Sequence, residues 1–315
     1  MKKFFYIFLL IAGVASLHSC KDLVDEQGDP LLDLNQNSGF NGPRALFREI
    51  TDKDTLYEYR YNGLQLNQVI TKGRKKGKSY TNISWSGDKI SKIMFYGFLD
   101  EDRNGVIDND SIAYTQLMTY NAGGKLETIS ENRSVYNLTA PVPPSTIPTL
   151  PYVLNKKYRT VYTVKYTVAT GKMSGISMIT GEDVTGTPFA YKNYSETTYS
   201  YLGDNVSEVI RSYGTLTGTV QSAPTEKYSY GYSVYDDKIS PFTLVPVVYK
   251  ISRILSILRN DYESQMFSPN SPRRITVSNL IPAIPVTTIF TSNYNYDPQT
   301  YMSKGFGVNY IYKPL

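Results

Sequence analysis

One repeated unit constrains the fold more than any other feature of the chain: an aromatic stretch, a tight turn and an aliphatic stretch. In the first copy, tyrosines alternate with other residues over 57–61, Asn62-Gly63 follows, and spaced aliphatic residues begin at Leu64. Period-2 aromatic residues beside Asn-Gly or Gly-Asp turns are the strongest short-range signal for a β-hairpin. The same order returns around Ser86-Gly87-Asp88, around residues 121–124, and around Gly203-Asp204-Asn205.

Repetition of this unit, about six or seven times, predicts an all-β fold built as an antiparallel meander of hairpins. Alternation within each strand gives the sheet one buried face and one solvated face. A sheet with so many strands must curl, close on itself or cover its apolar face. We therefore expect a large curved sheet, or an open or closed barrel.

One segment breaks the two-residue period. Apolar residues over 247–258 recur at helical spacing, while Lys250, Arg253 and Arg259 lie off this stripe. The pattern predicts one short amphipathic helix near 246–260, packed against the concave face of the sheet. A pair of buried β-branched strands is one alternative interpretation, and a helix that lies on a membrane surface is another.

The N-terminus is typical of an exported and lipidated protein. Two lysines precede an apolar run over 4–14, which is too short to span a bilayer comfortably. Leu17-His18-Ser19-Cys20 resembles a bacterial lipobox, and that resemblance implies that Cys20 is acylated and begins the mature chain. An ordinary cleaved signal peptide is the alternative. We expect a signal peptide over 1–19, an acidic tether with the lipidated cysteine over 20–45, and one β-rich domain over 46–315.

The mature chain would lack the side chains that most catalytic sites use. Cys20 and His18 are the only cysteine and histidine of the chain, so acylation and cleavage leave neither as a free group. Ser-His-Asp and Cys-His catalysis and ordinary zinc sites are then excluded. The net charge of +5 falls further once the signal peptide leaves, and this is too weak to favour nucleic acid. We therefore predict a protein that is not an enzyme and binds no nucleic acid.

The last 85 or so residues resemble a known group of proteins. The residues that carry this resemblance are Tyr235 to Phe242, Phe267 to Ile275, Asn293 to Asp297, and Asn309 to Tyr312. Their order is similar to that of uncharacterised Bacteroidota lipoproteins with a predicted porin-like, all-antiparallel fold, and the similarity extends more weakly back to Tyr57. We expect the last hairpin of the fold to run from Asn293–Asp297 to Asn309–Tyr312. The chain departs from the pattern at Asp297-Pro298-Gln299, where a turn containing Asn-Gly or Asp-Gly is usual. The resemblance implies a fold and an outer-membrane lipoprotein, on the periplasmic face or the cell surface, and implies no activity.

An acidic segment over 100–111 follows the spacing of a calcium-binding loop. Oxygen-bearing side chains alternate along it, and a glycine stands at the sixth position, where the chain must turn sharply. The twelfth position holds serine instead of a bidentate glutamate, so a solvated acidic turn is the alternative. The candidate Ca2+ ligands are Asp100, Asp102, Asn104, Val106 through its carbonyl, Asp108, Asp110 and Ser111.

Two classes of function agree with these observations. In the first, a membrane-anchored lipoprotein acts as a binding or scaffold module for a glycan, a surface partner or an envelope protein. In the second, the curved sheet and the helix over 247–258 enclose a lipid or another apolar ligand, and the protein is a carrier. A filled interior would favour the first class, and an interior cavity the second.

Overall fold

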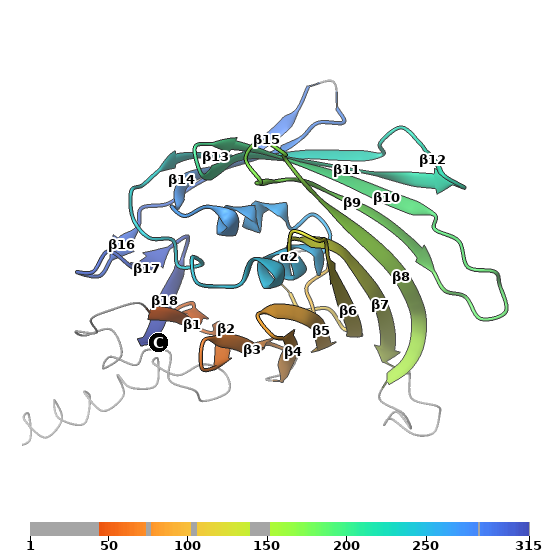
Figure 1. Ribbon diagram of the computed structural model, residues 1–315, viewed down its shortest axis with the longest axis horizontal. Helices are drawn as coiled ribbons and strands as arrows, with labels where there is room; N and C mark the ends of the chain where they lie inside the picture. The colour runs from red at the N-terminus through yellow and green to blue at the C-terminus, as the bar shows by residue number, and fades with distance from the viewer. Residues whose placement is uncertain (1–43, 74–76, 102–105, 139–151, 283, 315) are drawn as a thin grey trace, which may run out of the picture.

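The computed structural model describes residues 44–73, 77–101, 106–138, 152–282 and 284–314. The predicted signal peptide and Cys20 lie outside the described residues. In the described part, 18 strands form one sheet that wraps around a short helical segment (Figure 1). The prediction of an all-β antiparallel meander is confirmed.

The first nine strands follow one another along the chain in an unbroken meander. They are β1 (Arg44–Ile50), β2 (Thr55–Asn62), β3 (Gln65–Lys72), β4 (Lys78–Ser86), β5 (Lys89–Gly97), β6 (Ser111–Tyr120), β7 (Leu126–Leu138), β8 (Tyr152–Tyr166) and β9 (Met173–Glu182).

The second half of the chain continues the meander and contains the two helices found among the described residues. Its elements are β10 (Asn193–Leu202), β11 (Asn205–Thr217), β12 (Val220–Gln221), β13 (Glu226–Tyr235), the α-helix α2 (Val247–Leu255), the 3-10 helix η3 (Asp261–Phe267), β14 (Pro272–Asn279), β15 (Val286–Thr291), β16 (Asn295–Tyr296), β17 (Met302–Gly305) and β18 (Val308–Pro314).

All described strand pairs are antiparallel, and β18 pairs with β1, so the last strand lies beside the first. The ladder runs from β16 through β17 and β18 to β1, then through the meander to β11, β13, β14 and β15. The two end strands, β15 and β16, are joined along the chain by residues 292–294 alone. The described ladder is not closed between them, so the sheet is an incompletely closed barrel.

The predicted turns lie where the sequence placed them. Asn62-Gly63 separates β2 from β3, Ser86-Gly87-Asp88 separates β4 from β5, and Gly203-Asp204 separates β10 from β11. Gly63, Gly87 and Gly203 have φ values of +57°, +62° and +59°, which L-residues with a Cβ adopt only with strain. Glycine therefore fixes the position of each turn.

The interior of the sheet is filled by residues 236–271, which connect β13 to β14 and which we call the internal segment. It contains α2 and η3, and it lies inside the curve of the sheet in Figure 1. Ile251, Ile254 and Met266 of this segment are buried in the same apolar cluster as residues from the sheet. In the part of the chain that the structure describes, no helix is long and apolar enough to cross a membrane.

The helix differs from the predicted one in length and in burial. It ends at Leu255, and Ser256, the residue that follows, donates the last helical hydrogen bond from its backbone N–H to the Ser252 carbonyl. Arg259 has a φ of +59°, outside the helical region, so the helix does not extend to residue 260 as predicted. Lys250 and Arg253, which the sequence placed off the packed stripe, are buried. The reason is that the sheet surrounds the helix, so the polar face also contacts protein.

Two features at the ends of the sheet were not predicted correctly. The last hairpin was expected to run from Asn293–Asp297 to Asn309–Tyr312, but β16 pairs with β17, and β17 turns at Phe306-Gly307 into β18. The short β17 had no aromatic pattern to indicate it. At the other end, β1 begins at Arg44, two residues inside the predicted tether, and Arg44 and Ala45 are buried.

Candidate functional site

A buried ion cluster joins the internal segment to the sheet. Arg253 of α2 donates from Nε and Nη2 to the two carboxylate oxygens of Glu263, at 2.9 and 2.7 Å. Its Nη1 donates to Glu49 Oε1 of β1 at 2.6 Å and to Tyr59 Oη of β2 at 2.7 Å. The guanidinium carbon also lies 3.7 Å from the centre of the Tyr57 ring. Two carboxylates and a hydroxyl therefore contact the edges of this guanidinium, and an aromatic ring contacts its face.

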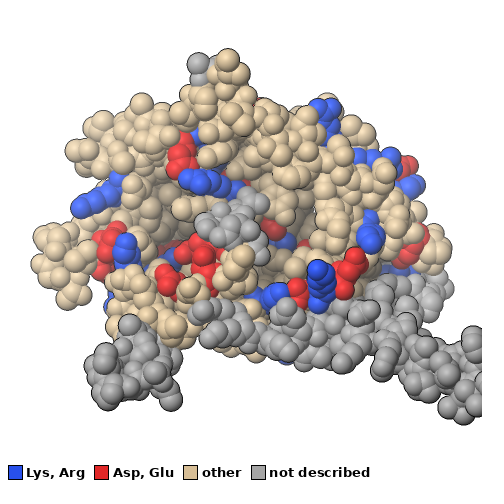
Figure 2. All heavy atoms as spheres, turned by 180° about the vertical axis from the view of Figure 1, so that it is seen from behind, with Lys and Arg blue, Asp and Glu red and all other residues tan. Residues whose placement is uncertain are grey.

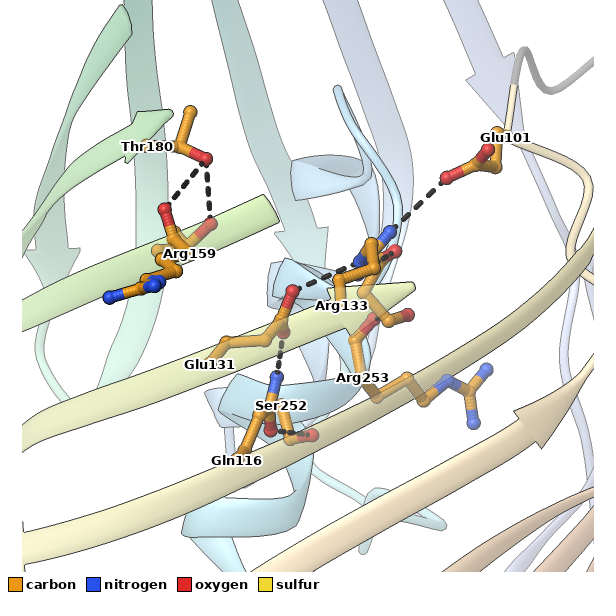
Figure 3. Close-up of polar contacts among 10 residues, drawn as sticks. Glu101, Gln116, Glu131, Arg133, Arg159, Thr180, Ser252 and Arg253 are labelled. Carbon is orange, nitrogen blue, oxygen red and sulfur yellow. Dashed lines mark hydrogen bonds and ion pairs between the residues drawn. The ribbon is translucent and has the colours of Figure 1, made fainter. Parts of the chain in front are cut away.

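A second network lies on the other side of α2 and is drawn in Figure 3. Arg133 donates from Nε to Glu131 at 3.0 Å, from Nη2 to the Ser256 carbonyl at 2.9 Å, and from Nη1 to Glu101 at 3.1 Å. Ser252 Oγ donates to Gln116 Oε1 at 2.6 Å, and the Gln116 amide donates to Glu131 at 2.7 Å. The network connects β6 and β7 to the end of the helix.

A third buried pair fixes η3. Arg211 Nη2 of β11 lies 2.9 Å from Asp261 Oδ1, and Arg211 Nε donates to Thr197 Oγ1 at 2.6 Å. In each of the three clusters a largely buried cation contacts at least one acid or acceptor from a different element, and such contacts fix the elements relative to one another. The three clusters hold the internal segment in place.

In several hairpins, the aromatic residue near the end of the first strand has a structural role that the sequence pattern did not reveal. Its polar atom donates to a backbone carbonyl near the start of the strand that precedes the hairpin. The examples are Tyr61 to Leu46 at 3.1 Å, Trp85 to Leu66 at 2.8 Å, Tyr120 to Ile90 at 2.6 Å, and Tyr201 to Met173 at 2.9 Å.

The residue after the turn adds a second link between neighbouring hairpins. Gln65 donates to the Gly87 carbonyl at 3.0 Å, Lys125 to Gly171 at 2.9 Å, and Lys172 to Gly203 at 2.6 Å. Lys125 and Lys172 also lie over the rings of Tyr166 and Tyr201. The repeated unit therefore links neighbouring hairpins by hydrogen bonds. At Tyr166 and Tyr201, a lysine covers one ring face that could otherwise stack on a sugar.

The predicted calcium loop connects β5 to β6 at the edge of this interior. Asp102 and Asn104 lie outside the described residues. Asp108 Oδ2 accepts the Glu101 backbone N–H at 2.7 Å and so closes the loop on itself. Burial raises the pKa of Glu101, Arg133 opposes that effect, and Asp108 adds to it. Within the described ranges, no three His, Cys, Asp or Glu side chains are grouped to hold a metal.

A surface cavity with two arginines lies where β13, β14 and β15 meet. Its volume is about 380 Å³, and it is lined by Val234, Arg273, Arg274, Thr291, Ser292 and Asn293. Neither arginine has an acid within ion-pair distance among the described side chains. Hydroxyl and amide groups accompany the two guanidinium groups, so the cavity offers several donors to an anion.

The backbone beside this cavity is strained. Val234 has a φ of +57°, which is a rare conformation for a β-branched residue, and its side chain is exposed. It lies between Ser233, which pairs with Arg274, and Tyr235, which pairs with Pro272. Strain of this kind concentrates at binding sites, where the surrounding structure maintains it. No sequence signal marked this cavity, because its parts come from three strands.

Charged side chains also gather on the face of the molecule shown in Figure 2. The surface there is hollowed, and acidic and basic side chains line the lower edge of the hollow. The fold and these sites define a class of protein. It is an antiparallel, barrel-like sheet whose interior is filled by a segment of the same chain, which buried ion pairs join to the strands.

Comparison with solved structures finds similar chains. The chain is similar to a porin-like protein from Bacteroides vulgatus, with 11% sequence identity and a TM-score of 0.33, over 87% of this chain and 100% of that chain. No protein-family model matches the sequence, and no curated protein matches it.

Proposed function

We propose that this protein is a non-enzymatic lipoprotein that binds an anionic glycan or another anionic envelope component. The cavity around Arg273 and Arg274 carries this proposal. Its volume of about 380 Å³ is within the range of small-ligand sites and suits one or two sugar units. Guanidinium groups recognise carboxylate, sulfate and phosphate groups through paired hydrogen bonds.

The proposed location is the outer membrane, on its periplasmic face or at the cell surface. Acylation of Cys20 would anchor the chain, since several acyl chains on one residue give stable membrane attachment. The anchored protein would then act as a binding or scaffold module beside the membrane.

A carrier of a lipid or other apolar ligand has less support. That function needs an apolar cavity between the sheet and the helix. Ile251 and Ile254 of α2 are at most 1% exposed and lie in the same cluster as sheet residues. The filled interior supports ligand binding at the surface instead.

The proposal is tested by titrating the protein with polygalacturonate, an acidic polysaccharide, and with dextran, a neutral one. We expect calorimetric binding of polygalacturonate that weakens with salt, and no binding of dextran. Replacing both cavity arginines (Arg273→Gln with Arg274→Gln) should weaken binding at least tenfold, because it removes charge-assisted hydrogen bonds.

Arg60→Gln with Arg159→Gln is the matched control. It removes the same charge from exposed positions elsewhere on the sheet. Equal loss of affinity in the two double variants would show a non-specific charge effect and contradict the proposed site. Tight binding of dextran would contradict the choice of an anionic ligand.

A further inference from the structure

The hairpin formed by β14 and β15 ends in an exposed apolar tip. Strand pairing ends at Asn279 and Val286, and residues 280–285 connect the two strands. The side chain of Ile284 is 84% exposed, and those of Val286 and Ile281 are 67% and 48% exposed. Folding leaves these aliphatic side chains in water, and the exposure of their apolar surface is unfavourable in free energy.

The apolar exposure continues down both faces of β15. All six residues of this strand are exposed, including Ile289 on one face and Phe290 on the other. No Asp, Glu, Lys or Arg occurs from Ile275 to Tyr296. In Figure 2 the projection at the top of the molecule, which is this hairpin, accordingly carries neither blue nor red spheres.

Among the described residues of the tip, few backbone N–H groups need water. Leu280 donates its N–H to the Lys227 carbonyl at 2.8 Å, and Ile281 donates to Asn279 Oδ1 at 3.1 Å. Pro282 and Pro285 have no N–H to satisfy. Removing these described residues from water therefore leaves few unsatisfied donors, and unsatisfied backbone groups are a large penalty for placing a loop in an apolar medium.

We propose that the tip of the β14–β15 hairpin inserts into the interfacial layer of a lipid bilayer. A protein groove or a second strand would cover one face or one edge of the hairpin and leave the other in water. A bilayer surrounds the tip and removes water from both faces at once. The free edge of β15 keeps unpaired backbone groups, so insertion stops at the tip, at the depth of interfacial segments.

The residues at the base of the tip suit a membrane with anionic headgroups. Lys227 accepts the hydrogen bond from Leu280 through its carbonyl and thus lies beside the tip. In the described part of the chain, its side chain has no acid within ion-pair distance. A cation at the boundary of an inserted apolar group attracts lipid phosphates.

The insertion is tested with the chain beginning at Lys21, which keeps every described residue and contains no cysteine. A single label of the environment-sensitive dye NBD is attached at Ile284→Cys. Vesicles of phosphatidylethanolamine and phosphatidylglycerol should raise its fluorescence several-fold and shift its emission to the blue. The same label at Leu202→Cys, in an exposed turn at the other end of the strands, should not respond.

A sedimentation assay with the same vesicles gives the second measurement. Ile281→Asn with Ile284→Asn should reduce vesicle binding at least tenfold, while Leu64→Asn with Leu202→Asn should not change it. Both pairs replace exposed side chains, so their melting temperatures should match that of the unsubstituted chain.

Three results would overturn the inference: no vesicle response at position 284, an equal response at position 202, or a response without vesicles that grows with protein concentration. The last would identify a second copy of the chain as the partner. The chain used here lacks Cys20, and the readout involves no glycan. Failure of the insertion would therefore leave the proposed glycan binding and acylation unaffected.

Discussion

Arg253 of α2 and Glu263 of η3 form a two-point ion pair inside the sheet, with both N–O distances below 3.0 Å. Glu49 of β1 contacts the same guanidinium, so one cation joins the two helices to the first strand. Burial by itself would lower the pKa of Arg253, but the two carboxylates raise it well above its usual range. The cluster therefore remains charged, and its stability depends on all three partners.

Removing the cation should strongly destabilise the protein. Arg253→Met leaves Glu49 and Glu263 buried without their counter-charge, and breaking such a buried pair costs about 3–5 kcal/mol. Urea denaturation at neutral pH measures the loss of unfolding free energy.

Arg259→Met is the control for this experiment. Arg259 pairs with Glu226 at the surface, with the two side chains 50% and 36% exposed, so its removal should cost less than about 1 kcal/mol. Similar losses for the two variants would mean that the internal segment is not packed as described.

Lys250 should make stability rise with pH in the mildly alkaline range. Burial lowers the pKa of its amine to about 8, whereas in the unfolded chain the pKa is near 10.5. Between these values the unfolded state binds a proton that the folded state does not, so the unfolding free energy increases as pH rises. The full increment is on the order of 3 kcal/mol.

The effect is measured as the difference between wild type and Lys250→Met at pH 7 and pH 9.5. The difference isolates the lysine, because the buried tyrosines are common to both proteins. We expect the methionine variant to be the more stable at pH 7 and to lose most of that advantage at pH 9.5. A difference that does not change with pH would contradict a buried, neutralised amine.

Calcium should stabilise the protein through the loop between β5 and β6. Its acidic side chains repel one another unless a cation lies among them. At a few millimolar calcium and a dissociation constant of ~10⁻⁴ M, linkage gives about 2 kcal/mol and a melting temperature several degrees higher than in chelator. Magnesium should stabilise less, since it dehydrates reluctantly.

Asp102→Ala with Asn104→Ala should remove the calcium increment and leave melting in chelator nearly unchanged. If wild type melts at the same temperature in calcium and in chelator, the segment is an acidic turn and not a metal site.

Acylation should depend on one side chain. Cys20→Ala removes the sulfur that would carry the acyl group, so metabolic labelling with palmitate should disappear and envelope association should weaken to what the β14–β15 tip alone provides. Undiminished envelope association in this variant would contradict the assigned anchor.

The sequence predicted the local parts of this fold well and the long-range parts poorly. The turns at Gly63, Gly87 and Gly203 were predictable because glycine and its neighbours decide a tight turn within a few residues. The pairing of β1 with β18 joins the two ends of the described chain, and no local pattern encodes such a contact.

The internal segment illustrates why the candidate sites were missed. On a surface helix, a charged residue off the apolar stripe is expected to face solvent. Because the sheet encloses α2, Arg253 instead forms an ion pair with Glu49, more than 200 residues away in the sequence. The sequence shows Arg273 and Arg274 as two adjacent cations. It does not show the cavity that they line, because Val234 and Thr291 come beside them only through the pairing of β13, β14 and β15.

Residues 236–271 are a permanent part of the core, and the proposed ligand site lies at the surface. Native-state hydrogen exchange of the backbone amides of α2 tests this most directly. We expect residues 251–255 to exchange as slowly as the amides of β5 and β6 and to open with the same free energy, because they are buried in one cluster. Fast exchange of α2 that slows only when an apolar ligand is added would contradict the claim and identify the protein as a carrier.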